Sequence, residues 1–369
     1  MRALASSTSC SRRGTSYETR WYGDPTMKVA VIGATGAVGR EMTRILEERR
    51  FPVDEFVPLA SARSAGRLVS FAGSEHEVRE LTVDAARGVD VAFVSARAST
   101  SKAFLPAIAQ AGTVCIDNSS AFRMEPDVPL SVPEVNPEAL EGWPHPGIIA
   151  VPNCTTIGTV LALGPLHRAA GCTSLVLSSY QAVSGAGWKG TRELAEQVGK
   201  LGGDVEALAH PDHDALPRGE VFSKPIAFNV VAQIGEFEPG GFTGEEVKIM
   251  AEPRKILSAP DMRVVATSVR VPVVTGHAVS MVVEFGRPIA VEEARELLAA
   301  APGVVLMDDP SNGVFPSPLE AAGGDDALVG RIRQVPGRDD ALALFSCVDN
   351  LRKGAALDAI QIAEHLYSR

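Results

Sequence analysis

The most constraining feature of this sequence is a glycine loop between a short apolar strand and a helix. Residues 28–32 have a strand pattern and lead into Gly33-Ala-Thr-Gly36-Ala-Val-Gly39, after which residues 40–49 have a helical pattern. Glycines in such a loop let the backbone approach a pyrophosphate, which then faces the positive N-terminal end of the helix. The spacing is GxxGxxG rather than GxGxxG, so the flanking strand and helix strengthen the interpretation. We expect a dinucleotide to bind along this loop.

Strands and helices that alternate after this loop predict a parallel, doubly wound sheet. Strand patterns recur at residues 55–60, 89–94 and 113–116, with a helical stretch near residues 102–111. Such alternation is typical of the α/β class, with helices on the faces of a parallel sheet. We therefore expect an N-terminal Rossmann-type dinucleotide domain. Because 369 residues is long for a single core, a second domain should follow it.

The end of the second strand favours NADP over NAD. Ligands of open α/β sheets lie at the carboxyl ends of the strands, so Ser61, Arg63 and Ser64 would face the adenosine ribose. An NAD site usually places Asp or Glu there, whereas Asp54 and Glu55 lie at the opposite end of this strand. Arg63 and the serines suit a 2′-phosphate, and NAD is the alternative.

A cysteine at a helix start is the candidate nucleophile. Val151-Pro-Asn-Cys154-Thr-Thr-Ile-Gly158 opens a helical pattern at residues 155–168. Unpaired N–H groups and the positive end of the helix dipole should lower the pKa of the Cys154 thiol. The same N–H groups could bind a developing oxyanion. The alternative is that Cys154 is a small buried core residue.

The second half of the chain supplies possible partners for Cys154. Arg270 and His277 lie seven residues apart in the β-rich stretch 263–284, which would place them on opposite faces of an unbroken strand. They can converge only if Pro272 or Gly276 breaks the strand. His277 would then be the base for a cysteine nucleophile, although a histidine in a strand can also be structural.

Several charged residues have both a structural and a functional interpretation. Thr243 and Glu246 form a capping box at the start of a helix, so Glu246 has a structural role. Glu245 and Lys248 share a face of this helix, either as an exposed ion pair or as groups presented to a site. Arg123 follows the strand at residues 113–116 and is either an anion clamp or a surface arginine.

Composition excludes several classes of function. The formal net charge of -10 argues against a nucleic-acid-binding surface, and no apolar run is long enough to span a membrane. Five cysteines without zinc spacing indicate reduced, cytosolic usage, and we expect no metal site. His210 and His213 lie in a long polar loop, residues 202–224, rather than in a ligand set. An anionic substrate would need locally placed Arg or Lys.

Together, six motifs resemble those of aspartate-β-semialdehyde dehydrogenase, in its bacterial form, over Met27 to Tyr367. The motifs are the glycine loop 33–39, Asp117-Asn-Ser-Ser-Ala-Phe-Arg123, Pro152-Asn-Cys-Thr-Thr156, Ser184-Gly-Ala-Gly187, the Arg270 to His277 spacing and Asp349-Asn-Leu-Arg-Lys-Gly-Ala355. One departure is residues 95–99, which read Ser-Ala-Arg-Ala-Ser where the family usually has a glycine-rich turn.

The resemblance implies a role for each matching residue. Cys154 is similar to the nucleophile that forms an acyl-thioester, His277 to the acid/base that takes its proton, and Gln181 to the residue that orients the substrate. Arg270 would bind the substrate α-carboxylate and Glu245 the α-amino group, while Arg123 and Lys248 would bind phosphate. NADP would contact residues of the glycine loop, the second strand end and three later positions: Gly33, Thr35, Gly36, Ala37, Val38, Arg63, Ser64, Ser184, Gly185 and Asn350.

The implied reaction is the reversible, NADP-dependent reductive dephosphorylation of L-aspartate 4-phosphate to L-aspartate 4-semialdehyde. It would serve the biosynthesis of lysine and diaminopimelate, threonine, methionine and isoleucine. The alternatives are an N-acetyl-γ-glutamyl-phosphate reductase, which has no need of Glu245, and a non-catalytic NADP-binding redox sensor that uses Cys154. We expect a cytoplasmic homodimer, with a tetramer as the alternative.

The same resemblance predicts the order of the domains. Residues 1–26 lack periodicity and would be a disordered or spurious extension, since Met27 begins a strand at once. Residues 27–152 would form the dinucleotide domain, residues 153–345 an α+β catalytic and dimerisation domain, and residues 346–369 a C-terminal helix that returns to the first domain.

Overall fold

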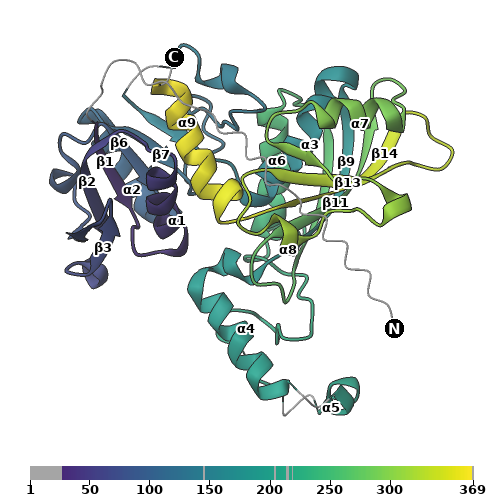
Figure 1. The fold of residues 1–369 in the computed structure, drawn as a ribbon, viewed down its shortest axis with the longest axis horizontal. Helices are drawn as coiled ribbons and strands as arrows, with labels where there is room; N and C mark the ends of the chain where they lie inside the picture. Colours follow the sequence, from purple (N-terminus) through teal and green to yellow (C-terminus); the bar gives the residue numbers. More distant parts are fainter. Residues whose placement is uncertain (1–26, 144–145, 203–204, 213–215, 218, 368–369) are drawn as a thin grey trace, which may run out of the picture.

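Two six-stranded sheets with a helix between them make up most of the fold, and a two-stranded sheet is added to the first half (Figure 1). A computed structural model describes residues 27–367 apart from 144–145, 203–204, 213–215 and 218. The predicted extension, residues 1–26, and His213 therefore lie outside the described residues. The predicted fold class, a Rossmann-type domain joined to an α+β domain, is confirmed.

The first sheet has six parallel strands in the order β5-β2-β1-β6-β7-β8. The strand order reverses between β1 and β6, and ligands of doubly wound folds bind at this switch point. The described elements of this half are β1 (Met27–Ile32), α1 (Ala37–Glu48), β2 (Val53–Ala60), η1 (Ala62–Ser64), β3 (Leu68–Phe71), β4 (Ser74–Glu77), β5 (Arg79–Glu80), η2 (Asp84–Ala86), β6 (Val91–Val94), α2 (Ala98–Gln110), β7 (Val114–Asp117), η3 (Pro137–Leu140) and β8 (Ile148–Ala150).

The second sheet is mixed, with the order β10-β9-β11-β14-β13-β12. Helices α3, α6 and α7 pack on one of its faces. The described elements of this half are α3 (Cys154–Ala170), β9 (Cys172–Gln181), η4 (Val183–Ala186), α4 (Gly187–Leu201), α5 (Val205–Ala209), α6 (Gly244–Ile256), β10 (Arg263–Arg270), β11 (His277–Phe285), α7 (Val291–Ala299), β12 (Val304–Leu306), η5 (Pro310–Asn312), α8 (Pro318–Ala321), β13 (Ala327–Gln334) and β14 (Ala341–Val348).

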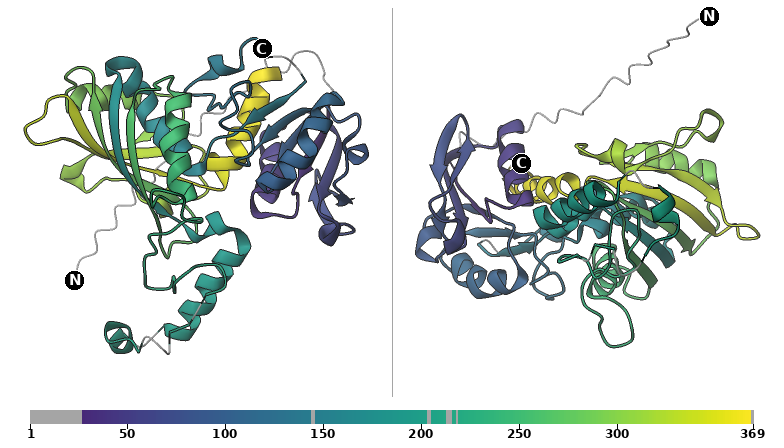
Figure 2. Two further views of the ribbon diagram at one scale, coloured as in Figure 1. Left: turned by 180° about the vertical axis from the view of Figure 1, so that it is seen from behind. Right: turned by 90° about the horizontal axis from the view of Figure 1, so that it is seen from below.

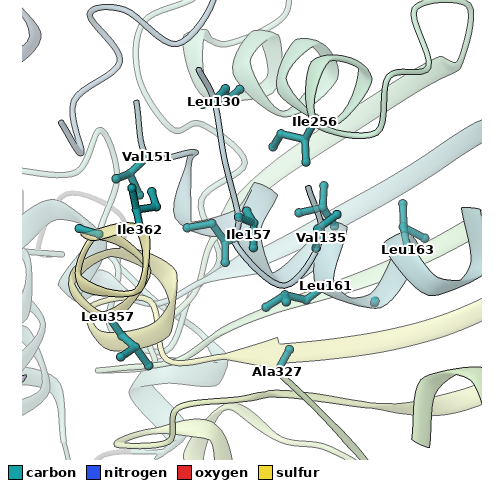
Figure 3. Close-up of a cluster of buried hydrophobic side chains, with 14 of the residues drawn as sticks. Leu130, Val135, Val151, Ile157, Leu161, Leu163, Ile256, Ala327, Leu357 and Ile362 are labelled. Atoms are coloured by element: carbon teal, nitrogen blue, oxygen red, sulfur yellow. The ribbon is translucent and has the colours of Figure 1, made fainter. Parts of the chain in front are cut away.

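Helix α3 is the buried centre of the molecule. Every residue from Thr155 to Leu166 is buried, so this helix has apolar contacts on all sides. Its side chains share one core with residues of α6 and α9 (Leu357–Tyr367), among them Ile157, Ile256 and Ile362 (Figure 3). Cys154 therefore lies at the end of a rigid element.

The C-terminal segment lies between the two sheets. A π-helical turn, η6 (Arg352–Ala356), precedes α9, and α9 packs against α1, β6 and β7 of the first half (Figures 1 and 2). Ion pairs join the parts: Arg49 Nη2 lies 2.6 Å from Glu364 Oε2, and Arg352 Nη1 lies 3.1 Å from Glu41 Oε1. The first half is thus completed by residues from the end of the described chain.

Several predicted boundaries differ from the structure by a few residues; helix α2, for example, begins at Ala98 rather than near residue 102. Helix α1 begins at Ala37 rather than at residue 40, because its first turn already lies inside the glycine loop. The segment 202–224 was expected to be a loop throughout, but it contains α5, where Leu and Ala precede the prolines and favour a helix.

Helix α4 projects away from the body of the molecule (Figures 1 and 2).

Candidate active site

Cys154 lies at the first position of α3, in a cavity of about 310 Å³ between the two halves. The cavity is lined by residues from the end of the glycine loop, from the segments after β6 and β7, from the cysteine stretch, from η4 and the start of α4, and from the C-terminal segment. These residues are Ala37, Val38, Ser95, Ala96, Asn118, Arg123, Pro152, Asn153, Cys154, Ser184, Gly185, Gly187, Asn350, Leu351, Gly354 and Ala355. Residues that are far apart in the sequence therefore meet in one pocket.

Asn153 caps the helix that carries Cys154. Its side-chain oxygen accepts hydrogen bonds from the N–H groups of Thr155, at 2.8 Å, and Thr156, at 3.3 Å. These two N–H groups were expected to be available to an oxyanion, and the cap occupies them instead. The N–H of Cys154 itself has no hydrogen-bond partner among the described residues.

The prediction of a low pKa for the Cys154 thiol is wrong for the site without substrate or cofactor. Burial raises the pKa of the thiol to about 11, and the nearby carboxylate of Glu245 adds to the rise. Arg123, Arg270 and the N–H of Thr155 act in the opposite direction but do not outweigh burial. The free thiol is therefore protonated at neutral pH.

This pKa predicts how Cys154 reacts with iodoacetamide when substrate is absent. Because only the thiolate is alkylated, and a pKa of about 11 leaves little thiolate at pH 7, the rate should rise about tenfold per pH unit from pH 7 to pH 9. Mass spectrometry of the Cys154 peptide after timed exposure measures this rate. A rate that is already constant above pH 7 would show a low thiol pKa instead.

Arg270 and His277 converge because the β-rich stretch is broken between them. Strand β10 ends at Arg270 and β11 begins at His277, with Gly276 at a φ of +96° in the connection. A Cβ atom on Gly185 would lie 2.8 Å from Arg270 Nη1 and 3.3 Å from His277 Cε1. Both side chains therefore border the same backbone position in the pocket wall, and a larger residue than glycine would collide there.

The hydrogen bonding of His277 defines its tautomer. Its Nδ1 accepts a hydrogen bond from the N–H of Ala182 at 3.0 Å, so the neutral ring carries its proton on Nε2. Nε2 is buried and has no partner among the described residues. Burial lowers the pKa of His277 to about 3, and the positive charge of Arg270 contributes to this shift. The imidazole is thus neutral at physiological pH.

Glu245 connects two other predicted site residues, Gln181 and Lys248, with Asn153. Its Oε1 accepts hydrogen bonds from Asn153 Nδ2 at 2.8 Å and from Gln181 Nε2 at 3.2 Å, and Lys248 Nζ lies 3.0 Å from its Oε2. Burial raises the pKa of Glu245, but Lys248 and the bond from Asn153 outweigh it and hold this pKa below its usual range. Glu245 is therefore a buried, ionised group that belongs to the site rather than to an exposed ion pair.

Arg123 lines the pocket but is already held on three sides. Its Nε donates to the Val151 carbonyl at 2.8 Å, its Nη2 to the Asn118 carbonyl at 2.7 Å, and its Nη1 to Glu252 Oε1 at 2.9 Å. Its guanidinium is consequently fixed, with its charge partly balanced by a carboxylate. Any anion that it binds must use the remaining N–H groups.

Glu252 and Asn153 were not singled out from the sequence. Glu252 Oε2 accepts the N–H of Asn153 at 2.7 Å, so this carboxylate holds both the helix cap and Arg123 in place. Its signal was its position seven residues after Glu245, two turns along the same face of α6. Asn153 could have been found as a preferred N-cap residue directly before a helix.

The glycine loop has the geometry of a phosphate cradle. Gly33 has a φ of +88°, and a Cβ atom on it would collide with the carbonyl of Ser95 at the end of the neighbouring strand β6. Gly36 offers no side chain to cap α1, so the first N–H groups of this helix stay free of a side-chain acceptor. The loop therefore fits an external anion at this helix end.

The remaining predicted cofactor contacts lie around the same cavity or at the end of β2. Asn350 Nδ2 donates to Ser184 Oγ at 3.0 Å, and Asn350 Oδ1 accepts the N–H of Gly276 at 2.9 Å, which ties η4 to the C-terminal segment. Ser64 Oγ lies 3.3 Å from Thr35 Oγ1, next to the exposed Arg63. Among the described residues no hydrogen-bond or ion-pair partner is found for Arg63, so its charge is available.

In the part of the chain that the structure describes, no group of three His, Cys, Asp or Glu residues could hold a metal ion. No helix in that part is both long enough and apolar enough to cross a membrane.

Comparison with known proteins identifies the family. Residues 28–143 match the semialdehyde dehydrogenase NAD binding domain, and residues 163–353 match the semialdehyde dehydrogenase dimerisation domain. The aspartate-semialdehyde dehydrogenase of Aquifex aeolicus is 46% identical over 340 residues, which cover 92% of this chain and 97% of that protein. The chain belongs to the aspartate-semialdehyde dehydrogenase family. The family's activity is the function that these comparisons support.

Solved structures of the family share the fold. The crystal structure of aspartate semialdehyde dehydrogenase II from Vibrio cholerae complexed with ASA has a TM-score of 0.85 at 41% identity, covering 93% of this chain and 98% of that one. The aspartate semialdehyde dehydrogenase from Candida albicans, solved with NADP, has a TM-score of 0.70 at 25% identity, covering 93% of this chain and 99% of that one. Both halves of the present fold therefore have experimental counterparts.

Proposed function

We propose that this chain catalyses the NADP-dependent, reversible reductive dephosphorylation of L-aspartate 4-phosphate to L-aspartate 4-semialdehyde through an acyl-thioester on Cys154. The observation that supports this most is the shared pocket, in which Cys154 lies with the end of the glycine loop and with Arg123, while the charges of Glu245 and Arg270 act on its thiol. The membership of the aspartate-semialdehyde dehydrogenase family supports the substrate.

The charges around Cys154 suit each polar group of this substrate. Arg270 would bind the α-carboxylate, and the ionised Glu245 would bind the α-amino group. Gln181, which donates a hydrogen bond to Glu245, would orient the substrate. Arg123 and Lys248 would bind the phosphate. A doubly anionic substrate explains why a chain with a net charge of -10 gathers three cations at one site.

In the proposed first step, the sulfur of Cys154 forms a bond to the acyl carbon and the bond from that carbon to the phosphate oxygen breaks. The thiol proton must leave, and His277 would accept it at Nε2. This requires the ring proton to sit on Nδ1, so the bond from Ala182 must be released as substrate binds. Because the pKa of His277 is low, the ring would pass this proton to the oxygen of the departing phosphate rather than keep it.

The second step returns Cys154 to its starting state. NADPH, when bound, supplies the hydride that reduces the thioester carbon. The amide of Cys154, which has no partner among the described residues, would hold the oxygen on which negative charge develops. The bond between sulfur and carbon then breaks, the semialdehyde leaves and the thiolate regains a proton.

We propose NADP rather than NAD as the cofactor, because Arg63 is exposed, has no partner among the residues that the structure describes and lies beside Ser64 at the carboxyl end of β2. The relative solved with NADP is consistent with this choice. Arg63→Ala should lower kcat/KM for NADP by about ten- to a hundredfold, the value of a lost charge-assisted bond, and leave kcat/KM for NAD unchanged. Steady-state kinetics with both cofactors test this, with Arg67→Ala as the matched control. An equal fall for both cofactors would contradict a 2′-phosphate contact.

A phosphate-dependent assay tests the function as a whole. Purified chain should form NADPH from L-aspartate 4-semialdehyde and NADP only when phosphate or arsenate is present. Turnover of the N-acetyl-γ-glutamyl semialdehyde instead would identify the rival reductase. NADP binding without turnover of either aldehyde would favour the redox sensor.

We also propose that the chain works as a homodimer. The face of the second sheet opposite α3 carries exposed apolar side chains on three adjacent strands, among them Val176, Val265 and Val282. Such a face is typical of a protein interface, and the matching family domain is described as a dimerisation domain. We expect sedimentation equilibrium to give twice the chain mass; four times the chain mass would indicate the tetramer.

The cysteines favour a cytoplasmic location. The four described cysteines are free, as is usual for proteins of the reducing cytoplasm. There the reaction would serve the biosynthesis of lysine and diaminopimelate, threonine, methionine and isoleucine.

A further inference from the structure

Two side chains on one face of helix α4 hold a neighbouring segment by accepting hydrogen bonds from the backbone N–H groups of that segment. The carboxylate of Glu193 is buried and accepts the N–H groups of Glu220 at 2.9 Å and Val221 at 2.7 Å, with that of Phe222 at 3.4 Å. One helical turn later, Gln197 Oε1 accepts the N–H of Ile226 at 2.8 Å and that of Ala227 at 3.1 Å. A buried carboxylate with several backbone donors is a strong local anchor. The segment 219–227 is thereby fixed on α4.

Two glycines around this anchor make room for the close packing of the segment on α4. A Cβ atom on Gly219 would collide with Glu193 Oε1, and a Cβ atom on Gly190 would lie 3.0 Å from Phe222 Cζ. Phe222 packs on a small apolar cluster that includes Val183 of η4. The ring of Phe222 is therefore held from both sides.

The fixed ring lies against the guanidinium of Arg270. The Cζ atom of Arg270 lies 6.0 Å from the centroid of the Phe222 ring, within the range of a cation–π contact. The Nη1 atom of Arg270 donates to the Ala182 carbonyl at 2.7 Å, and the side chain is only 5% exposed. The Phe222 ring covers one side of the Arg270 guanidinium, and the Ala182 carbonyl occupies one of its N–H groups. A ligand can therefore approach Arg270 from only a few directions.

We propose that Phe222, anchored by Glu193, is a positioning residue that orients Arg270 and excludes water from it, so that Arg270 can bind a substrate carboxylate. This inference rests on the proposed function for the identity of the carboxylate. An arginine that is shielded from water binds a carboxylate more tightly than an exposed one, because the attraction is less screened. Phe222 would consequently set the affinity for the substrate rather than the rate of the chemical step.

Phe222→Leu tests the proposal because leucine keeps apolar bulk but removes the ring face. We expect KM for L-aspartate 4-semialdehyde to rise about tenfold, the value of a desolvated cation–π contact, while kcat changes less than about threefold and KM for NADP stays unchanged. Phe222→Tyr should have the same KM as the unaltered chain, since tyrosine keeps the aromatic ring that leucine lacks. Phe228→Leu, at an exposed phenylalanine directly after this segment, is the matched control and should behave as the unaltered chain.

A second measurement is independent of the substrate. Phenylglyoxal labelling of Arg270, followed by peptide mass spectrometry, should be at least about fivefold faster in Phe222→Leu, because the ring no longer covers the guanidinium. Glu193→Gln should show the same direction of change. Unchanged labelling in Phe222→Leu, or equal rises in KM for semialdehyde, phosphate and NADP, would overturn the proposal. If the unaltered chain does not turn over the semialdehyde, the proposed function fails and the labelling result alone decides the role of Phe222.

Discussion

Cys154→Ala should lower turnover of the semialdehyde by on the order of 10⁴-fold or more, because the variant has no atom that can form the acyl bond. NADPH affinity, measured by fluorescence titration, should stay within about twofold, since the cavity wall at the glycine loop is untouched. The loss should appear in kcat rather than in KM. Near-normal turnover in this variant would end the thioester mechanism.

The remaining free cysteines supply the control for this result. Cys172 is buried, its pKa is raised to about 12 by burial, and it does not line the cavity. Cys172→Ala should therefore retain turnover even if it loses some stability. A comparable loss of activity in both variants would mean that general damage, rather than the missing nucleophile, explains the effect.

Lys353→Met should destabilise the fold by about 3–5 kcal/mol, the usual result of removing one member of a buried ion pair. Lys353 is 0% exposed. Its Nζ lies 2.9 Å from Glu134 Oε1, 3.2 Å from Asp358 Oδ1 and 2.7 Å from Gln361 Oε1. Methionine fills much of the volume but leaves these oxygens without a cation. Urea unfolding at pH 8 measures the loss, and Lys102→Met, at an exposed helix position, should stay within about 0.5 kcal/mol.

The loss in Lys353→Met should shrink as the pH falls. Burial raises the pKa of Asp358 to about 7, whereas Lys353 now holds the pKa of Glu134 below its usual range. Without the lysine, both carboxyl groups should have raised pKa values in the folded state, so each contributes stability at low pH that is lost as the pH rises through its folded pKa. The difference from the unaltered chain should thus be smaller at pH 5 than at pH 8. A difference that grows towards pH 5 would contradict this account.

Local patterns predicted much of the fold. The glycine loop and its neighbouring strands predicted the parallel sheet, because strand periodicity, turn glycines and helix patterns are local properties of the chain. The strand break between Arg270 and His277 could be foreseen at Gly276, which adopts a positive φ. The placement of Cys154 at a helix N-terminus followed from the same local reasoning.

Properties that depend on packing could not be predicted in this way. The pKa of Cys154 was expected to be low from the helix end alone, but it is controlled by burial and by Glu245, which lies 91 positions further along the sequence. The ion pair between Arg123 and Glu252 depends on contacts between distant segments. The roles proposed for Phe222 and Glu193 also had no local signal, because the segment 219–227 is irregular and its partners lie on α4 and at the end of β10.

The position of α9 determines which parts of this enzyme could be exchanged with those of a relative. A fragment that ended near residue 152 would lack the helix that covers α1, β6 and β7, and it would leave Arg49 and Glu41 without Glu364 and Arg352. It would also lack Gly354, where a Cβ atom would lie only 3.1 Å from that of Cys154. A chimera with a new dinucleotide specificity should therefore transfer residues 27–152 together with residues 349–367, since these two stretches pack against each other although nearly two hundred residues separate them.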